Sequence, residues 1–460
     1  GDHRLMIVVK FGGTSVGDAA AIARAAEIVR GRAVARPLVV VSAMAGVTNA
    51  LLALAEQAAR GHLVGALSAV AALRQRHLDA AATLVVGDDG ADLAGEVSAS
   101  FDELARLAEA LSVFGYLTPR TLDAIAAQGE LLSAPIVAAA LRTRGVDAEA
   151  IDPRQLMITD DAFGRAEPQA EAIAAAARDR ILPLLREGRL PVTGGFVGAT
   201  RDGVTTTLGR GGSDYSASLL GAALQADAIE IWTDVDGMLT ADPRVVPHAR
   251  LIERIRFDEA AELASFGAKV LHPSTITPAV RRGIPVYVYN SRRPEGTGTL
   301  ITADAPRRAV SAVAAKGDVT VVKLRSARML LAHGYLRNVF DVFNRHDTSV
   351  DVIATSEVSL SVTLDDASRL DALVADLRAF GDVSIERGRG IVAVVGAGLT
   401  DDPTALAQAF TALGPGVRVH MATVSATGIN LTLVIEADDV GPAMQRLHDA
   451  FFPPAAATSS

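Results

Sequence analysis

Residues 205–214 form the run TTTLGRGGSD, in which glycines and hydroxyl side chains surround a single arginine and a single aspartate. The segment has few apolar side chains to contribute to a core, and its glycines leave Arg210, Ser213 and Asp214 little to pack against. Glycine-rich backbone of this kind is typical of sites that bind polyanions through N–H groups. We therefore interpret the run as a functional segment that handles a phosphorylated ligand.

A second candidate phosphate site ends the first apolar run of the chain, where the sequence reads KFGGTS. Lys10 precedes Gly12 and Gly13, so the GxxxxGK[ST] spacing of a Walker P-loop is absent. A lysine at the carboxyl end of a first strand, followed by two glycines that open a helix, could instead place an ammonium and backbone N–H groups against β- and γ-phosphates. Taken alone this signal is weak, because glycine turns between strands and helices are common.

Three further polar clusters each have a structural interpretation beside a functional one. Ser42 and Thr48 belong to SAMAGVTN, where capping of a helix N-terminus competes with ligand binding. Glu130, in the tripeptide QGE, interrupts a region rich in alanine and leucine, and a solvated helix face would also explain it. Thr233 and Asp234 follow the apolar run IEIW. Added to the two glycine-rich segments, these clusters strengthen the prediction of a ligand site.

The elements that must position these residues follow an alternating pattern. From Ile7 to about Ile301, short β-branched runs alternate with longer stretches rich in alanine and leucine, which predicts a layered α/β domain with a mainly parallel sheet. Residues from about 49 to 141 are instead helical throughout and predict an inserted helical subdomain or lid. We place the whole domain at residues 1–301. The expected strands are 6–9, 38–42, 190–193, 228–232 and 286–289.

The C-terminal third contains an internal repeat. A weakly apolar, charge-rich stretch at residues 302–308 precedes it, and its period is about 71 residues. Each copy reads strand, helix, strand, strand, helix, which predicts two ferredoxin-like domains, at 309–388 and 389–452. The second copy lacks a final strand, so we expect it to borrow pairing from its neighbour or from another chain. Residues 453–460 predict a disordered tail or a linker.

The composition argues against several classes of function. With 460 residues the chain is long enough for two or three domains. Half of the residues are hydrophobic, yet the longest apolar runs fall short of the roughly 20 residues of a membrane span, and no cleavable signal is evident. The lack of cysteine excludes disulfides and thiolate sites and fits a reducing compartment. A net charge of −9 without basic runs argues against nucleic acid. We therefore expect a cytoplasmic protein whose partners are small molecules or copies of itself.

Seven motifs, taken in order, resemble the motif series of the aspartokinases, which are members of the amino-acid kinase family: KFGGTSV, SAMAGVTN, QGE, TTTLGRGGSD, WTDVDGM, DPRVV and FGAKVLHP. The two C-terminal repeats resemble the paired ACT domains of the same family, so the resemblance covers essentially the whole chain. Each motif is of low specificity alone, whereas seven in order at fitting separations are highly specific. The resemblance implies an amino-acid-kinase-like α/β domain followed by two ACT domains.

The resemblance also implies an activity and a set of site residues. The reaction is transfer of a phosphoryl group from ATP to the β-carboxylate of L-aspartate, which gives 4-phospho-L-aspartate for lysine, threonine and methionine synthesis. Mg²⁺ is expected to be held largely by the phosphates and water, with no protein ligand assigned. The implied catalytic residues are Lys10, Gly12, Gly13, Asp214 and Lys269. The implied aspartate-binding residues are Ser42, Thr48, Glu130, Arg210 and Ser213. The implied ATP-binding residues are Lys10, Gly12, Gly13, Thr233, Asp234, Leu239, Arg244, Lys269 and Val270.

Within these sets the family suggests individual roles. Lys10 and Lys269 would bind the phosphates and stabilise the transferring group, and Asp214 would orient Lys10. Arg210 would pair with the α-carboxylate of aspartate through a bidentate fork, while Glu130 would take its α-ammonium group. A substrate carboxylate is already a competent nucleophile, so cations and positioning matter more than a general base.

The first ACT copy matches the effector site of lysine-inhibited aspartokinases. The matching residues are Met329, Gly334, Tyr335, Val350, Asp351, Ser356 and Glu357. Asp351 and Glu357 would supply negative charge for an ammonium group, and the second copy has Ala422 and Gly428 in their places. The first copy is therefore the expected amino-acid site, with lysine as the expected effector. Ala332 replaces a serine expected in lysine-sensitive enzymes, so threonine stays open as an effector.

Two other functions were weighed against this one: a kinase acting on glutamate or N-acetylglutamate, and a non-catalytic ACT sensor. The ACT repeats with the QGE and TTTLGRGGSD motifs argue against the first. The presence of Lys10, Glu130, Arg210, Asp214 and Lys269 argues against a non-catalytic sensor, which would need none of them. The run VGAG at 395–398 lacks the third glycine of a dinucleotide fingerprint, so we expect no homoserine dehydrogenase domain within this chain. A longer natural protein fused beyond Ser460 stays open. We expect a homodimer through the ACT domains, with a tetramer also open.

Overall fold

The computed structural model describes residues 5–209, 211–267, 270–330 and 332–453. The chain divides into two compact units. Unit 1 contains residues 1–238 and 270–305, and unit 2 contains residues 239–269 and 306–460. The segment 239–269 thus lies between two parts of unit 1 in the sequence but packs with the C-terminal part of the chain. The domain boundaries predicted from the sequence stay predictions.

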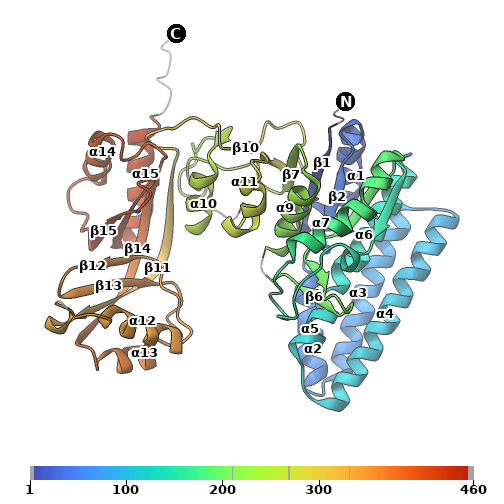
Figure 1. Cartoon of the computed structure of the whole chain (residues 1–460), viewed down its shortest axis with the longest axis horizontal. Coiled ribbons are helices and arrows are strands. Elements are labelled where there is room, and N and C mark those ends of the chain that lie inside the picture. Colours follow the sequence, from blue (N-terminus) through green and yellow to red (C-terminus); the bar gives the residue numbers. More distant parts are fainter. Residues whose placement is uncertain (1–4, 210, 268–269, 331, 454–460) are drawn as a thin grey trace, which may run out of the picture. The chain divides into compact units, whose positions relative to one another are not determined.

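A mainly parallel sheet forms the centre of unit 1 (Figure 1). The five predicted strands are present. The sheet also contains the short β3 and the antiparallel β10, which the sequence pattern does not predict because neither has a strong apolar run. Strands β1 and β2 are buried over their whole length, as expected for parallel strands covered on both faces. The order is β3 (Ala148–Ile151), β4 (Leu190–Gly194), β2 (Leu38–Val41), β1 (Ile7–Phe11), β7 (Ala228–Thr233), β9 (Val286–Asn290) and β10 (Thr299–Ile301). A separate antiparallel pair consists of β5 (Val197–Ala199) and β6 (Thr205–Thr207).

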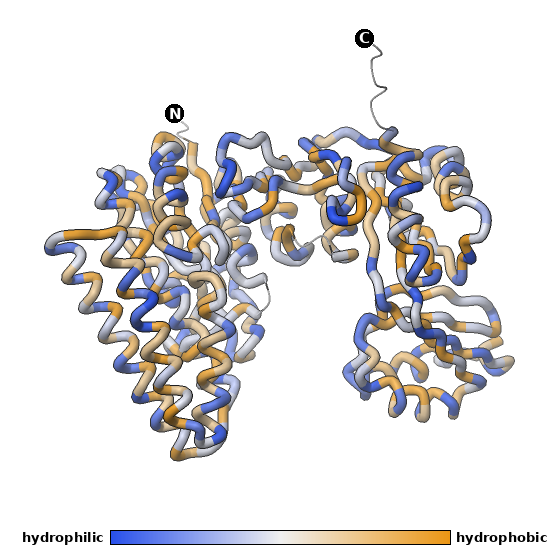
Figure 2. Tube along the Cα trace, turned by 180° about the vertical axis from the view of Figure 1, so that it is seen from behind, coloured by the Kyte–Doolittle hydropathy of each residue, from blue (hydrophilic) through white to orange (hydrophobic). Residues whose placement is uncertain are grey.

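Consecutive helices occupy the stretch that the sequence predicts to be helical. Buried side chains of α4 recur every three or four residues, and in Figure 2 the tube of α3 and α4 alternates between hydrophobic and hydrophilic colours. The helices of this stretch are α2 (Val47–Ala59), α3 (Leu63–Leu84), α4 (Asp88–Phe114), α5 (Pro119–Ala126) and α6 (Gln128–Thr143). The other helices of unit 1 are α1 (Ala19–Arg32), α7 (Ala170–Arg180), α8 (Leu182–Arg186), α9 (Gly212–Leu224) and α11 (Thr277–Arg281), with 3-10 turns at Gly13–Val16, Ala33–Ala35, Pro153–Gln155 and Pro273–Ile276.

One helical stretch of the described chain, Pro119–Thr143, is long and apolar enough to cross a membrane by length and composition alone. The sequence expectation that no apolar run approaches that length was therefore too strict. The apolar window of this stretch is 78% buried within the protein, as is usual for a core helix. The stretch carries Glu130, which lines the cavity described below, and Asp123, which supports a neighbouring strand.

Unit 2 is built around one six-stranded sheet, in the order β12-β13-β11-β14-β16-β15 (Figure 1). Its strands are β11 (Ala312–Arg325), β12 (Ile353–Thr355), β13 (Ser359–Leu364), β14 (Asp382–Val395), β15 (Met421–Val424) and β16 (Asn430–Glu436), with a short β8 (Arg254–Ile255) in the segment 239–269. Its helices are α10 (Phe257–Ser265), α12 (Tyr335–Arg345), α13 (Leu370–Leu377), α14 (Pro403–Leu413) and α15 (Val440–Phe451), with 3-10 turns at Ala327–Met329 and Ala437–Asp439.

The long strand β11 serves both ferredoxin-like repeats. Its second half pairs with β13 and with the first half of β14, as the first strand of the first repeat. Its first half, residues 312–316, pairs with residues 391–395 of β14, which is the place of the missing fourth strand of the second repeat. A register shift between Lys316 and Val321 marks the change from one repeat to the other. The expectation that the second repeat borrows a strand from its neighbour is thus confirmed.

Candidate active site

Unit 1 has a cavity at the carboxyl ends of its central parallel strands. Because β1, β2 and β7 run parallel in matched register, the residues that follow them meet at one edge of the sheet. The cavity has a volume of about 380 Å³. Seven predicted site residues line it: Lys10, Gly13, Ser42, Thr48, Glu130, Ser213 and Asp214. These residues are spread over more than 200 positions of sequence, and the fold brings them together.

Lys10 and Asp214 form a buried ion pair in this cavity. Lys10 lies in β1 and is only 7% exposed, and its Nζ is 2.7 Å from Asp214 Oδ1. Asp214 stands in the first turn of α9, which begins after Gly211. Gly211 has a φ of +73°, a conformation that glycine adopts without a steric penalty. The turn therefore directs the carboxylate at a lysine that burial would otherwise leave without a counter-charge.

Glu130 is a buried carboxyl group with one unused oxygen. Its side chain is 3% exposed, and Oε1 accepts a hydrogen bond from the Ala43 N–H at 3.2 Å. Within the described chain, Oε2 is buried and has no hydrogen-bond partner. Burial raises the pKa of Glu130 from 4.5 to about 8, although the Ala43 N–H and the charge of Lys10 act in the opposite direction. An acceptor held in this way beside a cavity is suited to a cationic group of a ligand.

The neighbouring Gly129 explains why the tripeptide QGE has a glycine before the glutamate. A Cβ atom at Gly129 would lie 2.6 Å from the Ala43 side chain, far closer than carbon atoms can approach. The glycine therefore lets the start of α6 pack directly against the segment that follows β2. This contact brings the Glu130 carboxyl group within reach of the Ala43 N–H.

Hydroxyl groups line the side of the cavity between β2 and α9. Ser42 Oγ donates to Ser213 Oγ at 3.0 Å, which links the first residue after β2 with the start of α9. Helix α2 begins after Gly46, and no side chain caps its N-terminus. The capping explanation for Ser42 and Thr48 is therefore wrong. Both residues line the cavity instead.

The remaining predicted residues lie outside the cavity lining. Gly12 adjoins it, since a Cβ atom at Gly12 would lie 3.5 Å from Lys10 Nζ, which is in the lining. Thr233, at the end of β7, Asp234 and Val270 belong to the same unit but do not line the cavity. Leu239 and Arg244 belong to unit 2, where Arg244 forms a bidentate pair with Asp242, with a shortest N···O distance of 2.6 Å. Two predicted residues, Arg210 and Lys269, lie outside the described residues.

Comparisons with known proteins agree with this geometry. The amino acid kinase family matches residues 5–290, and an ACT domain matches residues 392–451. The lysine-sensitive aspartokinase 3 of Escherichia coli K12 is 41% identical over 458 residues, which cover 97% of this chain and 99% of that protein. The chain belongs to the aspartokinases. A second relative, the chloroplastic aspartokinase 3 of Arabidopsis thaliana, is 34% identical, and the alignment covers 98% of this chain and 82% of that protein.

Solved structures of aspartokinases share the fold. The crystal structure of E. coli aspartokinase III in complex with lysine and aspartate superposes with a TM-score of 0.83 at 40% identity and covers 97% of this chain and 99% of that one. The structure of the same E. coli enzyme with aspartate and ADP gives a TM-score of 0.82 at 40% identity, with 97% and 100% of the two chains covered. The prediction of an amino-acid-kinase α/β domain followed by ACT domains is therefore confirmed.

The sequence motifs did not reveal two residues of the aspartokinase: Asp123, which supports the site from outside the cavity, and Phe196, which lines it. Asp123, in α5, is 2% exposed and accepts hydrogen bonds from the Gly164 N–H and from the N–H and hydroxyl of Thr207. It thereby holds the strand that leads into the glycine-rich run 205–214. A lone carboxylate within the apolar run LDAIAA at residues 122–127 was the signal that could have revealed it.

Phe196 lines the cavity with a φ of +65°, a conformation that costs energy for a bulky residue. Its N–H is held by Ser216 Oγ at 2.9 Å, and its carbonyl accepts from the Leu208 N–H. The surrounding hydrogen bonds thus fix the strained backbone beside the site. No sequence pattern at this position announces it.

The predicted effector residues lie in unit 2 of the aspartokinase, around the first ACT repeat. Burial raises the pKa of Asp351 to about 6, helped by the neighbouring Asp365, while Lys316 at 3.5 Å acts against the rise. Tyr335 donates its hydroxyl to the Phe380 carbonyl, and Glu357 is exposed. The others are Met329, Gly334, Val350 and Ser356, of which Gly334 caps α12 and Ser356 hydrogen-bonds to Ser359.

Proposed function

We propose that this aspartokinase transfers the γ-phosphoryl group of ATP to the β-carboxylate of L-aspartate and gives 4-phospho-L-aspartate and ADP. The observation that carries the proposal is the buried, unused oxygen of Glu130 in the cavity that also holds the Lys10–Asp214 pair. Glu130 is placed to recognise the α-ammonium of an amino acid, and Lys10 is placed to bind the phosphoryl group. The E. coli relative crystallised with aspartate and ADP supports the same pair of substrates.

In this proposal, aspartate binding uses a hydrogen-bond acceptor for the α-ammonium and hydrogen-bond donors for the carboxylates. Glu130 Oε2 would accept from the α-ammonium, and the ion pair would repay the cost of ionising a buried carboxyl group. The hydroxyl groups of Ser42, Thr48 and Ser213 would donate to the substrate's carboxylates. In this proposal Arg210 holds the α-carboxylate through a bidentate fork.

Phosphoryl transfer requires charge stabilisation more than proton transfer. An oxygen of the β-carboxylate attacks the γ-phosphorus, the bond to the β,γ-bridging oxygen breaks, and ADP leaves with the electron pair. Lys10, held by Asp214, would stabilise the negative charge on the transferring group, together with the backbone N–H groups near Gly12 and Gly13. Lys269 would supply a second positive charge. No general base is needed, because the carboxylate is ionised at neutral pH.

The nucleotide itself would extend from these phosphate contacts towards the end of β7. Thr233 and Asp234 follow that strand at the same edge of the sheet as Lys10, and we assign Leu239, Arg244 and Val270 to nucleotide binding on the family motif alone. The two carboxylates of the cavity fit a protein-bound Mg²⁺ poorly, since Asp214 is paired with Lys10 and burial favours the protonated form of Glu130. Mg²⁺ would accordingly be held by the phosphates and water, where it neutralises their charge.

The activity is tested by a coupled assay that follows ADP release, with the acyl phosphate trapped by hydroxylamine. We expect both signals to require L-aspartate and to appear in equal amounts. ADP release that does not depend on aspartate, or an equal rate with L-glutamate, would contradict the proposal and favour another amino-acid kinase.

Replacing Arg210 with alanine is expected to raise the KM for aspartate by at least about 100-fold, since a bidentate charged contact contributes roughly 3 kcal/mol. The KM for ATP should change by less than about threefold. Steady-state kinetics with each substrate varied in turn measures both values. Equal effects on the two KM values would remove Arg210 from the aspartate site.

We further propose that lysine inhibits the enzyme at the first ACT repeat and that two copies pair through their ACT repeats. The lysine-sensitive E. coli relative and its crystal structure with bound lysine support the effector. Exposed apolar side chains on the two edge strands of the sheet, Ile353 on β12 and Val424 on β15, support an interface there. Threonine remains the alternative effector.

Replacing Glu357 with alanine is expected to raise the lysine concentration for half-inhibition by at least about tenfold, because the exposed carboxylate would lose its contact with the effector ammonium. The kcat without lysine should stay unchanged. The matched control is Asp371→Ala, which removes another exposed carboxylate of the same repeat and should leave lysine inhibition intact. Unchanged inhibition in Glu357→Ala would place the effector elsewhere.

A further inference from the structure

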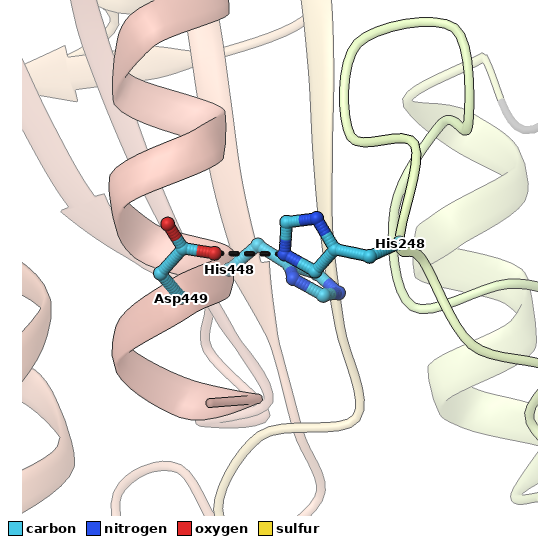
Figure 3. A group of neighbouring side chains, drawn as sticks. All are labelled: His248, His448 and Asp449. Atoms are coloured by element: carbon cyan, nitrogen blue, oxygen red, sulfur yellow. Dashed lines mark hydrogen bonds and ion pairs between the residues drawn. The ribbon is translucent and has the colours of Figure 1, made fainter. Parts of the chain in front are cut away.

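Unit 2 contains a group of three metal-ligating side chains outside the sites described above: His248, His448 and Asp449. His248 lies on a loop of the segment 239–269, whereas His448 and Asp449 are adjacent on α15. Figure 3 shows the three side chains together, with the His248–Asp449 contact dashed, and the two imidazole rings meet edge-on at an interplanar angle of 77°. One potential ligand atom from each residue lies within 4.8 Å of the other two. His248 Nε2 and Asp449 Oδ1 are 2.8 Å apart.

The second, independent observation is an unused ring nitrogen in the protein interior. His448 is completely buried, and its Nδ1 has no hydrogen-bond partner within the described part of the chain. Its other nitrogen, Nε2, is 2.8 Å from Thr240 Oγ1. That hydroxyl oxygen already accepts the Arg250 N–H at 2.8 Å. A proton on Nε2, shared with Thr240, leaves a free lone pair on Nδ1, which is the state of an imidazole that binds a metal ion.

The loop that carries His248 is held firmly against α15. Val246 is completely buried in the same core cluster as Leu447 of that helix. The Val245 carbonyl accepts a hydrogen bond from the Gln445 side chain at 3.0 Å. The two ends of the loop are joined by two hydrogen bonds, from the Thr240 N–H to the Arg250 carbonyl and from the Arg250 N–H to the Thr240 hydroxyl. The backbone thus presents the His248 ring to His448, and the two ring centroids are 5.1 Å apart. A site assembled on anchored backbone loses little freedom when an ion binds.

We propose that His248, His448 and Asp449 bind a divalent transition-metal ion such as Zn²⁺, with water completing the coordination. Two imidazoles and one carboxylate are a donor set that Zn²⁺ accepts in tetrahedral sites. Two ligand atoms on one tetrahedral Zn²⁺ lie about 3.4 Å apart, so ligand atoms that are now up to 4.8 Å from one another must approach by up to about 1.4 Å. The side chains of His248 and Asp449 are about half exposed and can rotate to do this. The Asp449 carboxylate also offsets the positive charge of the nearby Arg250 guanidinium, which donates to the Pro453 carbonyl.

The ion would join the segment 239–269 to the last helix of the second ACT repeat. Without the ion, that junction includes the Val246 packing, the hydrogen bonds of Thr240 and Gln445, and a half-exposed His–Asp pair. Zn²⁺ would replace the His–Asp pair by three coordination bonds and would give the buried Nδ1 a partner. A folded state that binds an ion which the unfolded chain binds less well is stabilised by that binding.

The first ACT repeat contains a matched control, the contact between His346 and Asp376. His346 Nε2 and Asp376 Oδ2 are 2.7 Å apart, nearly the distance of the His248–Asp449 pair. No third ligand group adjoins this pair in the described residues. It therefore reproduces the His–Asp contact without a buried second histidine.

The test is Zn²⁺ binding to the full chain, stripped of metal with a chelator and free of ATP, by calorimetry, and Co²⁺ binding by visible absorption. We expect one saturable ion per chain and a Co²⁺ spectrum of four-coordinate type. His248→Ala and Asp449→Asn, which change exposed groups and should leave the fold intact, are each expected to weaken binding at least tenfold. His346→Ala should bind as the wild type does. A wild-type protein without saturable Zn²⁺ binding, or equal losses in His346→Ala and His248→Ala, would overturn the proposal.

Discussion

Replacing Lys10 with alanine is expected to lower kcat for aspartate phosphorylation by at least about 1,000-fold, equivalent to about 4 kcal/mol of transition-state stabilisation. Lys10 is 7% exposed and lines the cavity that we assign to the phosphoryl group. Water cannot replace a buried cation where negative charge develops on the transferring group. Steady-state kinetics at saturating ATP and aspartate measures the effect, and a turnover near that of the wild type would remove Lys10 from the phosphate site.

A control for folding is needed because the substitution also leaves Asp214 without its partner. Removing one partner of a buried ion pair such as Lys10–Asp214 destabilises a protein by about 3–5 kcal/mol. The double variant Lys10→Met with Asp214→Asn removes both charges and should recover most of that stability in thermal unfolding. It should remain as inactive as Lys10→Ala. Recovery of activity together with stability would show that Lys10 acts only through the fold.

Replacing Glu130 with glutamine is expected to raise the KM for aspartate by at least about 100-fold and at the same time to stabilise the free enzyme. Glutamine keeps an acceptor for the Ala43 N–H but removes the charge that would meet the substrate ammonium. The gain in the free energy of unfolding at pH 8 and above should be about 2 kcal/mol or more, with an upper bound of roughly 5 kcal/mol from the pKa rise. Urea unfolding and aspartate kinetics measure the two effects.

The raised pKa of Glu130 fixes how the free energy of unfolding and the KM for aspartate should change with pH. Burial raises the pKa of Glu130 to about 8, so the folded protein binds one proton more than the unfolded chain between pH 4.5 and about pH 8. The free energy of unfolding contributed by this group therefore falls as the pH rises through that window. Aspartate binding needs the ionised form, so its KM should fall up to tenfold per pH unit from pH 6 towards 8. Both dependences should be lost in Glu130→Gln.

Glu259 provides the matched comparison for Glu130. It is also completely buried, but Oε1 accepts from the Ser311 hydroxyl at 2.6 Å and the Ala397 N–H at 2.8 Å, and Oε2 accepts from the Arg256 N–H. Its carboxylate already has partners, so Glu259→Gln should destabilise the protein and leave the aspartate KM unchanged. Stabilisation by both substitutions would mean that the Glu130 carboxylate is not held ready for a ligand.

Much of the site could be predicted because its residues stand at fixed positions relative to strand ends. An apolar run followed by lysine and two glycines places the ammonium at the carboxyl edge of a parallel sheet, and Lys10 lies there in β1. Asp123 and Phe196 could not be found in the same way. Their importance depends on partners far away in sequence, at Thr207 for Asp123 and at Ser216 for Phe196.

The repeat shows the same limit. The alternation of apolar residues predicted the strands of both ACT copies, since side chains on a strand point to opposite faces with a period of two. It did not identify the fourth strand of the second copy, because residues 312–316 stand at the start of the first copy in the sequence and reach the second half of β14 only through the shared sheet.

The ordered motifs are enough to predict the chemistry, since they carry the lysine, the glutamate and the glycines that an amino-acid kinase needs. The period of about 71 residues predicts the ACT repeat. The charge state of the lysine and the glutamate, in contrast, depends on contacts that form only in the folded protein. Lys10 meets Asp214 across 204 positions, and burial against Ala43 raises the pKa of Glu130 to about 8. Folding also brings His248 against the buried ring of His448, with the two ring centroids 5.1 Å apart. Charge and affinity at a site depend on distance and on exclusion of water, and both arise only when distant segments pack together.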